Sequence, residues 1–228
     1  MNRKLFSVVK KIAFILVSLI GILIIYVLID NRNSKDMSFR QKIMKTVYPF
    51  LVRMGNKKQI AAPENKKSSP VSFYSLSATL MSGETLQFEK LRGKKVVIVN
   101  TASNCGYTPQ YKELQFLYEK EKNTIEILAF PSNDYKQQEK SDNQSIAAFC
   151  QKNYGVSFPL MQKIITVKKK DQHPVYQWLT DPEKNGWNNQ VPSWNFSKYV
   201  INENGELTHY FDPAVSPKDE VFLKAIGR

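Results

Sequence analysis

The centre of the chain reads Val96-Val97-Ile98-Val99-Asn100-Thr101-Ala102-Ser103-Asn104-Cys105-Gly106-Tyr107-Thr108-Pro109. Its first half is rich in β-branched residues and predicts a buried strand. The residues from Pro109 to about Glu121 predict a helix, so Cys105 lies in the turn between a strand and a helix N-terminus. Backbone N–H groups there stabilise a thiolate, and we expect them to lower the pKa of the Cys105 thiol below its usual value. Position alone leaves a reactive cysteine and a buried, inert cysteine as equal alternatives.

The sequence on either side of this stretch predicts a compact α/β domain over residues 71–228. Strand–helix–strand units followed by a hairpin and a last helix are the order of a thioredoxin-like fold, with a central mixed sheet flanked by helices. The Asn204-Gly205 pair is a strong hairpin signal. The expected strands lie near 95–102, 124–130, 197–202 and 206–211, the expected helices near 109–121, 143–154, 173–180 and 217–226, and a further hairpin near 81–84.

Two more segments carry chemistry-bearing side chains next to expected strands. One reads Phe130-Pro131-Ser132-Asn133-Asp134-Tyr135-Lys136-Gln137-Gln138-Glu139, and the other reads Trp194-Asn195-Phe196-Ser197-Lys198-Tyr199. A Cys after one strand, a Gln after the next and a Trp-Asn pair before a later strand resembles the glutathione peroxidase family, over about residues 71–228. The resemblance implies a thioredoxin-like fold and a cysteine-type thiol peroxidase that reduces hydrogen peroxide and organic or lipid hydroperoxides.

The resemblance also implies the roles of the site residues. Cys105 would be the nucleophile, with Gln138, Trp194 and Asn195 as neutral hydrogen-bond donors around its sulfur. Such donors stabilise a developing anion without fixing the thiolate in an ion pair. Gln137 competes for the role of Gln138, but the family's Gln directly precedes Glu, as Gln138 does here.

The only other cysteine of the chain is Cys150, within the expected helix 143–154. A cysteine in the middle of a helix is most often a small core residue. In family members that use thioredoxin rather than glutathione, a cysteine on this helix resolves the sulfenic acid to a disulfide. The resemblance therefore implies Cys150 as resolving cysteine, which requires the helix to unwind locally. It implies no cofactor, and the reductant is thioredoxin-like or glutathione.

The sequence departs from the family in one loop and one connection. Ser132 stands where many members have Cys, Asp134 replaces the usual Gln, and Lys136-Gln137 replace a glycine-containing pair. These changes leave the conformation of the loop open. The connection 166–174 lacks the insertion that builds tetramers in some members, so we expect a monomer with an open site.

Related chemistries on the same fold lack their required residues. A thioredoxin-type Cys-x-x-Cys would need a cysteine in place of Thr108, and a copper chaperone's Cys-x-x-x-Cys would need one in place of Pro109. Ordinary peroxiredoxins carry Thr or Ser where Ala102 stands. No zinc-ligand spacing or phosphate-binding glycine loop is present, and no metal site is expected. A redox sensor or relay that uses the same two cysteines remains the alternative function.

Charge is distributed unevenly along the 228 residues, whose net charge is +13. Residues 1–70 carry 14 Lys and Arg against 3 Asp and Glu, whereas residues 71–228 carry 19 against 17. Basicity therefore belongs to the N-terminal part, and the expected domain is nearly neutral. A basic segment beside a hydrophobic one is typical of contact with lipid headgroups, so we expect no nucleic-acid binding.

The N-terminal part divides into a basic tail (1–11), an uncharged run Ile12–Ile29, and a basic juxtamembrane segment and linker (30–70). The uncharged run is long enough to cross a bilayer. A cleaved signal peptide is the rival interpretation, but its apolar region is usually shorter and ends in small residues. We therefore expect a single-pass membrane anchor.

Basic residues flank this run on both sides, so the positive-inside rule gives no clean orientation. The short basic tail favours a catalytic domain on the non-cytoplasmic side. Residues 43–54 are amphipathic in part and predict a helix that either lies on the membrane surface or packs on the domain. Residues 57–70 are polar and predict a flexible tether.

Overall fold

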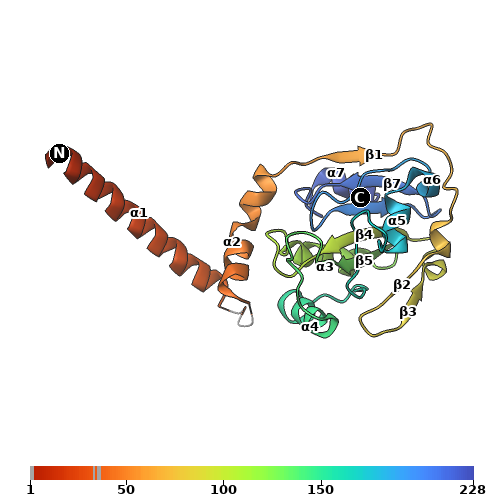
Figure 1. Cartoon of the computed structure of the whole chain (residues 1–228), viewed down its shortest axis with the longest axis horizontal. Helices are drawn as coiled ribbons and strands as arrows, with labels where there is room; N and C mark the ends of the chain where they lie inside the picture. Colours follow the sequence, from red (N-terminus) through yellow and green to blue (C-terminus); the bar gives the residue numbers. More distant parts are fainter. Residues whose placement is uncertain (1–2, 33, 35–36) are drawn as a thin grey trace.

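The computed structural model describes residues 3–32, 34 and 37–228. Two helices, α1 (Arg3–Asp30) and α2 (Phe39–Met54), precede a rounded domain, and α1 extends away from it (Figure 1). Within α1, Val8–Ile29 is long and apolar enough to cross a membrane, and its side chains are almost all exposed. A signal sequence near an N-terminus also meets this criterion of length and composition.

Within the described residues, five strands form one mixed sheet in the order β1-β7-β6-β4-β5. Only β4 and β5 pair in parallel, through a crossover that contains α3 (Gln110–Glu121). The sheet and its covering helices confirm the predicted thioredoxin-like fold. The strands are β1 (Gln59–Ala61), β4 (Lys95–Thr101), β5 (Ile125–Pro131), β6 (Lys198–Ile201) and β7 (Leu207–Phe211).

The edge strand β1 lies in the segment that was expected to be a flexible tether. Gln59, Ile60 and Ala61 pair antiparallel with β7, which gives this polar segment a fixed place in the sheet. Ile60 packs against the core while its neighbours stay exposed. A strand of three residues is too short to show an alternation of apolar and polar side chains, so the pattern does not predict it.

The core lies on both faces of the sheet because successive side chains of a strand point to opposite sides. Val97 and Val99 of β4 belong to one buried cluster, and Val96 and Ile98 belong to the other. The first cluster lies under α3, α4 (Asn143–Tyr154) and α7 (Glu220–Ala225). The second lies under α5 (Pro174–Leu179), the 3-10 turns η1 (Phe73–Ser75) and η2 (Phe88–Leu91), and the hairpin β2 (Ser77–Thr79) and β3 (Thr85–Gln87).

The helix that carries Cys150 begins at a capping residue and ends at a glycine. Asp142 caps α4 by accepting from the Ser145 N–H at 2.8 Å. Gly155 ends it in a left-handed conformation (φ 65°), which a glycine adopts without steric cost. The expected helix 143–154 is therefore confirmed, whereas the single turn α6 (Pro182–Asn185) was not foreseen.

Candidate active site

Cys105 lies in the loop that leaves the carboxyl end of β4, as its position in the sequence predicted. The backbone N–H of Cys105 donates to Thr108 Oγ1 (3.1 Å), and that hydroxyl group also contacts the Ala102 and Cys105 carbonyl oxygens (2.8 Å each). The Tyr107 N–H points at the sulfur, with N and Sγ 3.4 Å apart. Thr108 thus closes the loop on itself and fixes the direction of the thiol.

The pKa of the Cys105 thiol differs from the expectation. Burial raises it to about 11, because the side chain is only 1% exposed and desolvation disfavours the thiolate. Hydrogen bonds from the Tyr107 backbone and from the Trp194 and Asn195 side chains lower it, but less than burial raises it. The structure brings the predicted Trp194 and Asn195 side chains to the sulfur, but the sequence does not reveal how deeply the sulfur is buried.

Trp194 and Asn195 reach the sulfur from the segment that precedes β6. Asn100 at the end of β4 holds this segment, since its Nδ2 donates to the Trp194 carbonyl oxygen at 3.0 Å and its own carbonyl oxygen accepts from the Phe196 N–H. Phe196 has a positive φ of 70°, which is uncommon for a residue with a side chain. The chain therefore makes a strained turn that directs both side chains towards Cys105.

Gln138 joins the site through Asn195. Asn195 Nδ2 donates to Gln138 Oε1 at 3.0 Å, and the Asn104 N–H beside the catalytic loop donates to the Gln138 carbonyl oxygen at 3.1 Å. Gln137 is exposed. The structure thus brings Gln138, and not Gln137, to the other three predicted residues.

The backbone of this loop explains how it accommodates a changed sequence. Lys136 and Gln137 both lie in the left-handed region, at φ 49° and 52°, where a glycine would fit without strain. Asp134 anchors the loop, because its Oδ2 accepts from the Ser132 and Thr166 hydroxyl groups at 2.8 and 3.0 Å. These contacts compensate for the missing glycines and keep Gln138 in place.

Glu139 is a buried residue of the site that the sequence analysis did not single out. Its Oε2 accepts from the N–H and the hydroxyl group of Ser103 at 2.7 and 2.9 Å. Its Oε1 has no hydrogen-bond partner among the described residues. Burial raises the pKa of Glu139 to about 7, against the lowering effect of Ser103. Its position directly after Gln138 was the available signal, but a Glu in a polar loop usually faces water.

Cys150 lies on the buried face of α4 and is fully buried. It belongs to the same apolar cluster as Cys105, together with Tyr111 of α3. Burial raises the pKa of Cys150 to about 12, while the Tyr111 side chain lowers it. The thiols of both cysteines are free in this structure. The two thiols therefore belong to one core cluster, but Cys105 lies in the loop after β4 and Cys150 lies in α4.

A hollow of about 450 Å³ opens beside the site. Tyr107 and Trp194 line it together with Asn56, which follows α2. The Lys136 ammonium group lies 5.7 Å from the centre of the Trp194 ring. Among the described residues, no group of three or more His, Cys, Asp or Glu side chains is arranged to hold a metal ion. The hollow gives a small molecule a path towards the indole that contacts Cys105.

Comparison with known proteins gives consistent matches. A family model described as glutathione peroxidase matches residues 73–180. The glutathione peroxidase of Lactococcus lactis subsp. cremoris is 42% identical over 150 residues, which are 65% of this chain and 94% of that protein. The glutathione peroxidase-like peroxiredoxin 2 of Saccharomyces cerevisiae is 41% identical over 147 residues, which are 64% of this chain and 90% of that protein.

A solved structure with the same architecture is that of Trgpx in its apo form, with a TM-score of 0.53 and 28% identity over 70% of this chain and 98% of that chain. All three proteins are matched over nearly their whole length, whereas about a third of this chain lies outside each match. The matched relatives therefore consist of little more than the domain that carries Cys105.

Proposed function

The chain belongs to the glutathione peroxidase family, and from this membership we propose that it is a thiol peroxidase that reduces hydrogen peroxide and organic or lipid hydroperoxides through Cys105. One observation carries the proposal. Cys105, Gln138 and the Trp194-Asn195 pair come from three distant segments and meet in one hydrogen-bonded group. A buried cysteine of the core would not require this arrangement of neutral donors.

The first step is the attack of the Cys105 sulfur on one peroxide oxygen. The thiol gives up its proton, an S–O bond forms, and the O–O bond breaks. The leaving oxygen takes up a proton and departs as water or as an alcohol, and Cys105 becomes a sulfenic acid. The sulfur is oxidised by two electrons and the peroxide is reduced by two.

Trp194, Asn195 and Gln138 stabilise the charge that develops in this step. Fixed N–H donors in a site that excludes water contribute strongly to the stability of such a charge, because they need no reorganisation. The Trp194 and Asn195 side chains also offset part of the desolvation that holds the thiol protonated at rest. Asn195 links to Gln138, so a change in one alters the orientation of the other.

Cys150 closes the cycle as the resolving cysteine. Its sulfur attacks the sulfenic sulfur, an S–S bond forms, and the S–O bond breaks to release water with the Cys150 proton. We infer that α4 opens locally to bring the fully buried Cys150 to Cys105, because a disulfide needs Cα atoms within about 7 Å. A dithiol reductant of the thioredoxin type then returns both cysteines to thiols, and its own dithiol becomes a disulfide. The peroxiredoxin name of the yeast relative is in keeping with this cycle.

The cellular setting follows from α1. We assign Val8–Ile29 as a single-pass anchor, because its Ile12–Ile29 part carries no charged residue and its side chains are almost all exposed. The catalytic domain then works as a monomer at the membrane, on the non-cytoplasmic side. The alternative function is a redox sensor that passes oxidation from Cys105 to a partner protein.

Steady-state peroxide consumption separates the two functions. The assay uses residues 37–228, which keep α2 on the Cys105 loop and β1 in the sheet, and supplies excess thioredoxin or excess glutathione in parallel. We expect sustained turnover with thioredoxin, far slower turnover with glutathione, and none from Cys105→Ser. A single turnover that stops with either reductant would refute the enzymatic proposal and leave the sensor.

A further inference from the structure

Helix α2 packs one of its faces on the loop that carries Cys105. Met44 and Leu51 lie on this face, seven residues apart, which is two helical turns. A Cβ placed on Gly106, the residue after Cys105, would lie 2.7 Å from Leu51 Cδ1 and 3.6 Å from Met44 Sδ. Any larger residue at this position would require the Leu51 side chain to shift. The helix therefore covers the catalytic loop directly.

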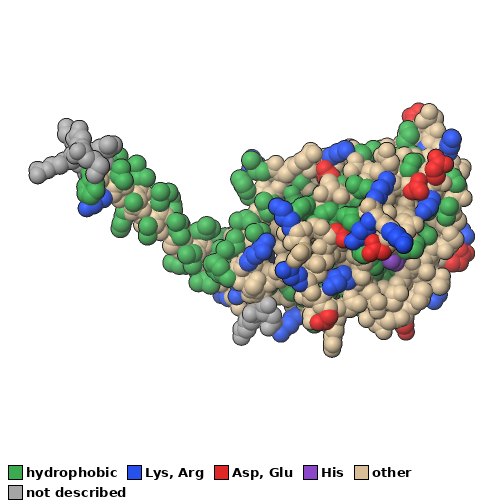
Figure 2. All heavy atoms as spheres, in the orientation of Figure 1, with side chains coloured by type: hydrophobic (Ala, Val, Ile, Leu, Met, Phe, Trp, Pro, Cys, Tyr) green, Lys and Arg blue, Asp and Glu red, His purple; other side chains and the backbone are tan. Residues whose placement is uncertain are grey.

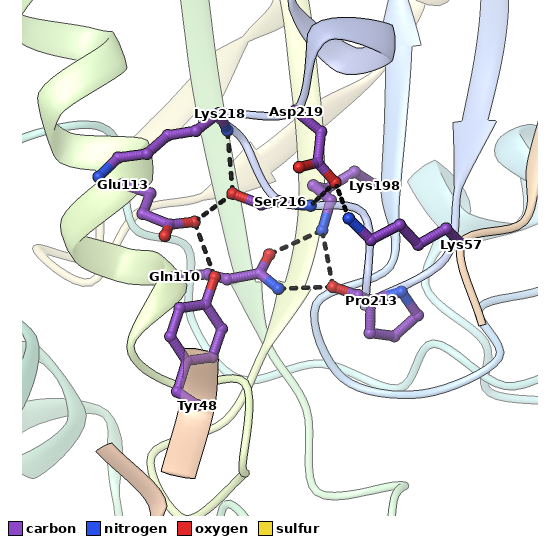
Figure 3. Close-up of polar contacts among 9 residues, drawn as sticks. All are labelled: Tyr48, Lys57, Gln110, Glu113, Lys198, Pro213, Ser216, Lys218 and Asp219. Carbon is purple, nitrogen blue, oxygen red and sulfur yellow. Dashed lines mark hydrogen bonds and ion pairs between the residues drawn. The ribbon is translucent and has the colours of Figure 1, made fainter. Parts of the chain in front are cut away.

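Polar contacts fix the rotation of α2 on the domain. Gln41 Nε2 donates to the Ser103 carbonyl oxygen at 3.1 Å, two residues before Cys105. Tyr48 Oη donates to Glu113 Oε2 at 2.7 Å, and Glu113 also accepts from Ser216, so α2 joins a network that continues across α3 and the C-terminal segment (Figure 3). The inner face of α2 is therefore held at both its beginning and its middle.

The segment after α2 is tied to the same network. Lys57 forms an ion pair with Asp219 at 2.9 Å, and Asp219 accepts from the Ser216 N–H (Figure 3). A Cβ on Gly55 would lie 2.5 Å from Ala214 Cβ and 2.9 Å from Tyr107 Oη. The end of α2 is thus pressed against the domain next to the hollow that leads to Trp194.

The opposite face of α2 presents large apolar side chains to the surroundings. Phe39, Phe50 and Met54 are 52%, 63% and 69% exposed. They lie 11 and 15 residues apart, close to three and four turns, and so form one stripe along the helix. Leaving such side chains in water is unfavourable, at roughly 25 cal/mol per Å² of apolar surface. The stripe is a surface without a covering element among the described residues.

The position and charge of α2 indicate what covers this stripe. Asn31, directly after α1, donates to the Val27 carbonyl oxygen and to Thr46 Oγ1, so the end of the apolar helix α1 is tied to α2. Hydrophobic side chains cover α1 and continue onto α2, with Lys and Arg side chains beside them (Figure 2). The sequence of α2 has no Asp or Glu and carries the basic residues Arg40, Lys42, Lys45 and Arg53.

We propose that α2 is an interfacial helix that inserts Phe39, Phe50 and Met54 into an anionic lipid surface while its other face holds the Cys105 loop. An apolar stripe flanked by Lys and Arg is the pattern of helices that lie in the headgroup region of a bilayer. Because α2 contacts Gly106 and Ser103 directly, the catalytic loop then sits within one helix diameter of the lipid. This contact is separate from the anchor α1 and does not depend on the reaction of Cys105.

Spin labels on the full chain test this proposal. The labels are attached at Phe50→Cys and at Met54→Cys in a Cys105→Ser, Cys150→Ser background, and the protein is placed in vesicles of phosphatidylcholine and phosphatidylglycerol. Collision rates with oxygen, which concentrates in lipid, and with a water-soluble nickel chelate report the surroundings of each label. Val71→Cys is the matched control, because Val71 is an exposed apolar residue that is bonded near α6, on the other side of the domain (Figure 1).

We expect the ratio of oxygen to nickel collisions to be several-fold higher at Phe50 and Met54 than at Val71. Equal ratios at all three positions would overturn the proposal, because the stripe would then face water. Dipolar broadening of the spectrum of the label at position 50 that disappears on dilution with unlabelled protein would also overturn the proposal. It would show that a second copy of the chain, and not lipid, covers the stripe. All three labelled side chains are exposed, so the fold tolerates each substitution.

Discussion

Replacement of the buried carboxyl group by an amide, in Glu139→Gln, is expected to stabilise the domain in a manner that depends strongly on pH. Burial raises the pKa of Glu139 from its ordinary value of 4.5 to about 7. Between these two values the folded protein keeps the proton and the unfolded chain has lost it. The free energy of unfolding of the wild type therefore falls as pH rises from 4.5 to 7 and stays level above pH 7.

The size of this effect follows from the same shift. Each pKa unit corresponds to about 1.4 kcal/mol, so the ionised form of Glu139 costs the folded state about 3 kcal/mol above pH 7. Glutamine cannot ionise, but its oxygen can still accept from the N–H and the hydroxyl group of Ser103. The amide NH₂ takes the place of Oε1, which has no partner among the described residues. This exchange changes the free energy of unfolding by an amount that does not vary with pH.

Urea unfolding of a reduced fragment of residues 37–228, which keeps α2, measures this difference in the free energy of unfolding when it is followed by tryptophan fluorescence. The free energy of unfolding of the wild type is subtracted from that of Glu139→Gln at each pH, so that the contributions of all other titrating groups cancel. Between pH 4.5 and pH 8 we expect the free energy of unfolding of the variant to rise by about 3 kcal/mol relative to that of the wild type. A difference that stays constant over this range would refute the reasoning, because Glu139 would then ionise equally easily in the folded and unfolded states.

Three further predictions concern the site and the anchor. Gln138→Ala should slow sulfenic acid formation at Cys105 by roughly 10²-fold in stopped-flow measurements, whereas Gln137→Ala should leave it unchanged; the reverse order would show that the wrong glutamine was assigned. Burial raises the pKa of Cys105 to about 11, so its alkylation by iodoacetamide should accelerate about tenfold per pH unit from pH 7 to pH 9, and a plateau below pH 8 would contradict this burial. The full chain should stay with membranes through carbonate washes because of Ile12–Ile29, and release by salt alone would leave only its basic segments as lipid contacts.

The fold was predictable where the sequence pattern is long and regular. The largely apolar strands β4 and β5, the Asn204-Gly205 turn and the capped helix α4 all lie where the sequence pattern predicts them. The strand β1 was not predictable, because its three residues gain their structure from pairing with β7 rather than from their own pattern. Tertiary context decides such a segment.

The candidate site was predictable as a set of residue types but not as an electrostatic environment. Local motifs identified Cys105, Gln138 and the Trp194-Asn195 pair, because each motif follows or precedes a recognisable strand. The burial that raises the pKa values of Cys105 and Glu139 depends on how several elements pack, and no local pattern encodes it. The contact of α2 with Gly106 escaped the sequence analysis for the same reason.

Titration of the reduced domain with peroxide, followed by thiol counting and mapping of the disulfide, tests the central claim most directly. One equivalent of hydrogen peroxide should remove both thiols and form one intramolecular bond between Cys105 and Cys150, with faster amide exchange across 143–154 as α4 opens. Cys150→Ser should react once, accumulate sulfenic acid and then sulfinic acid at Cys105, and lose turnover with thioredoxin. Full thioredoxin-dependent turnover by Cys150→Ser, with no bond between the two cysteines in the wild type, would contradict the account and return Cys150 to the role of a core residue.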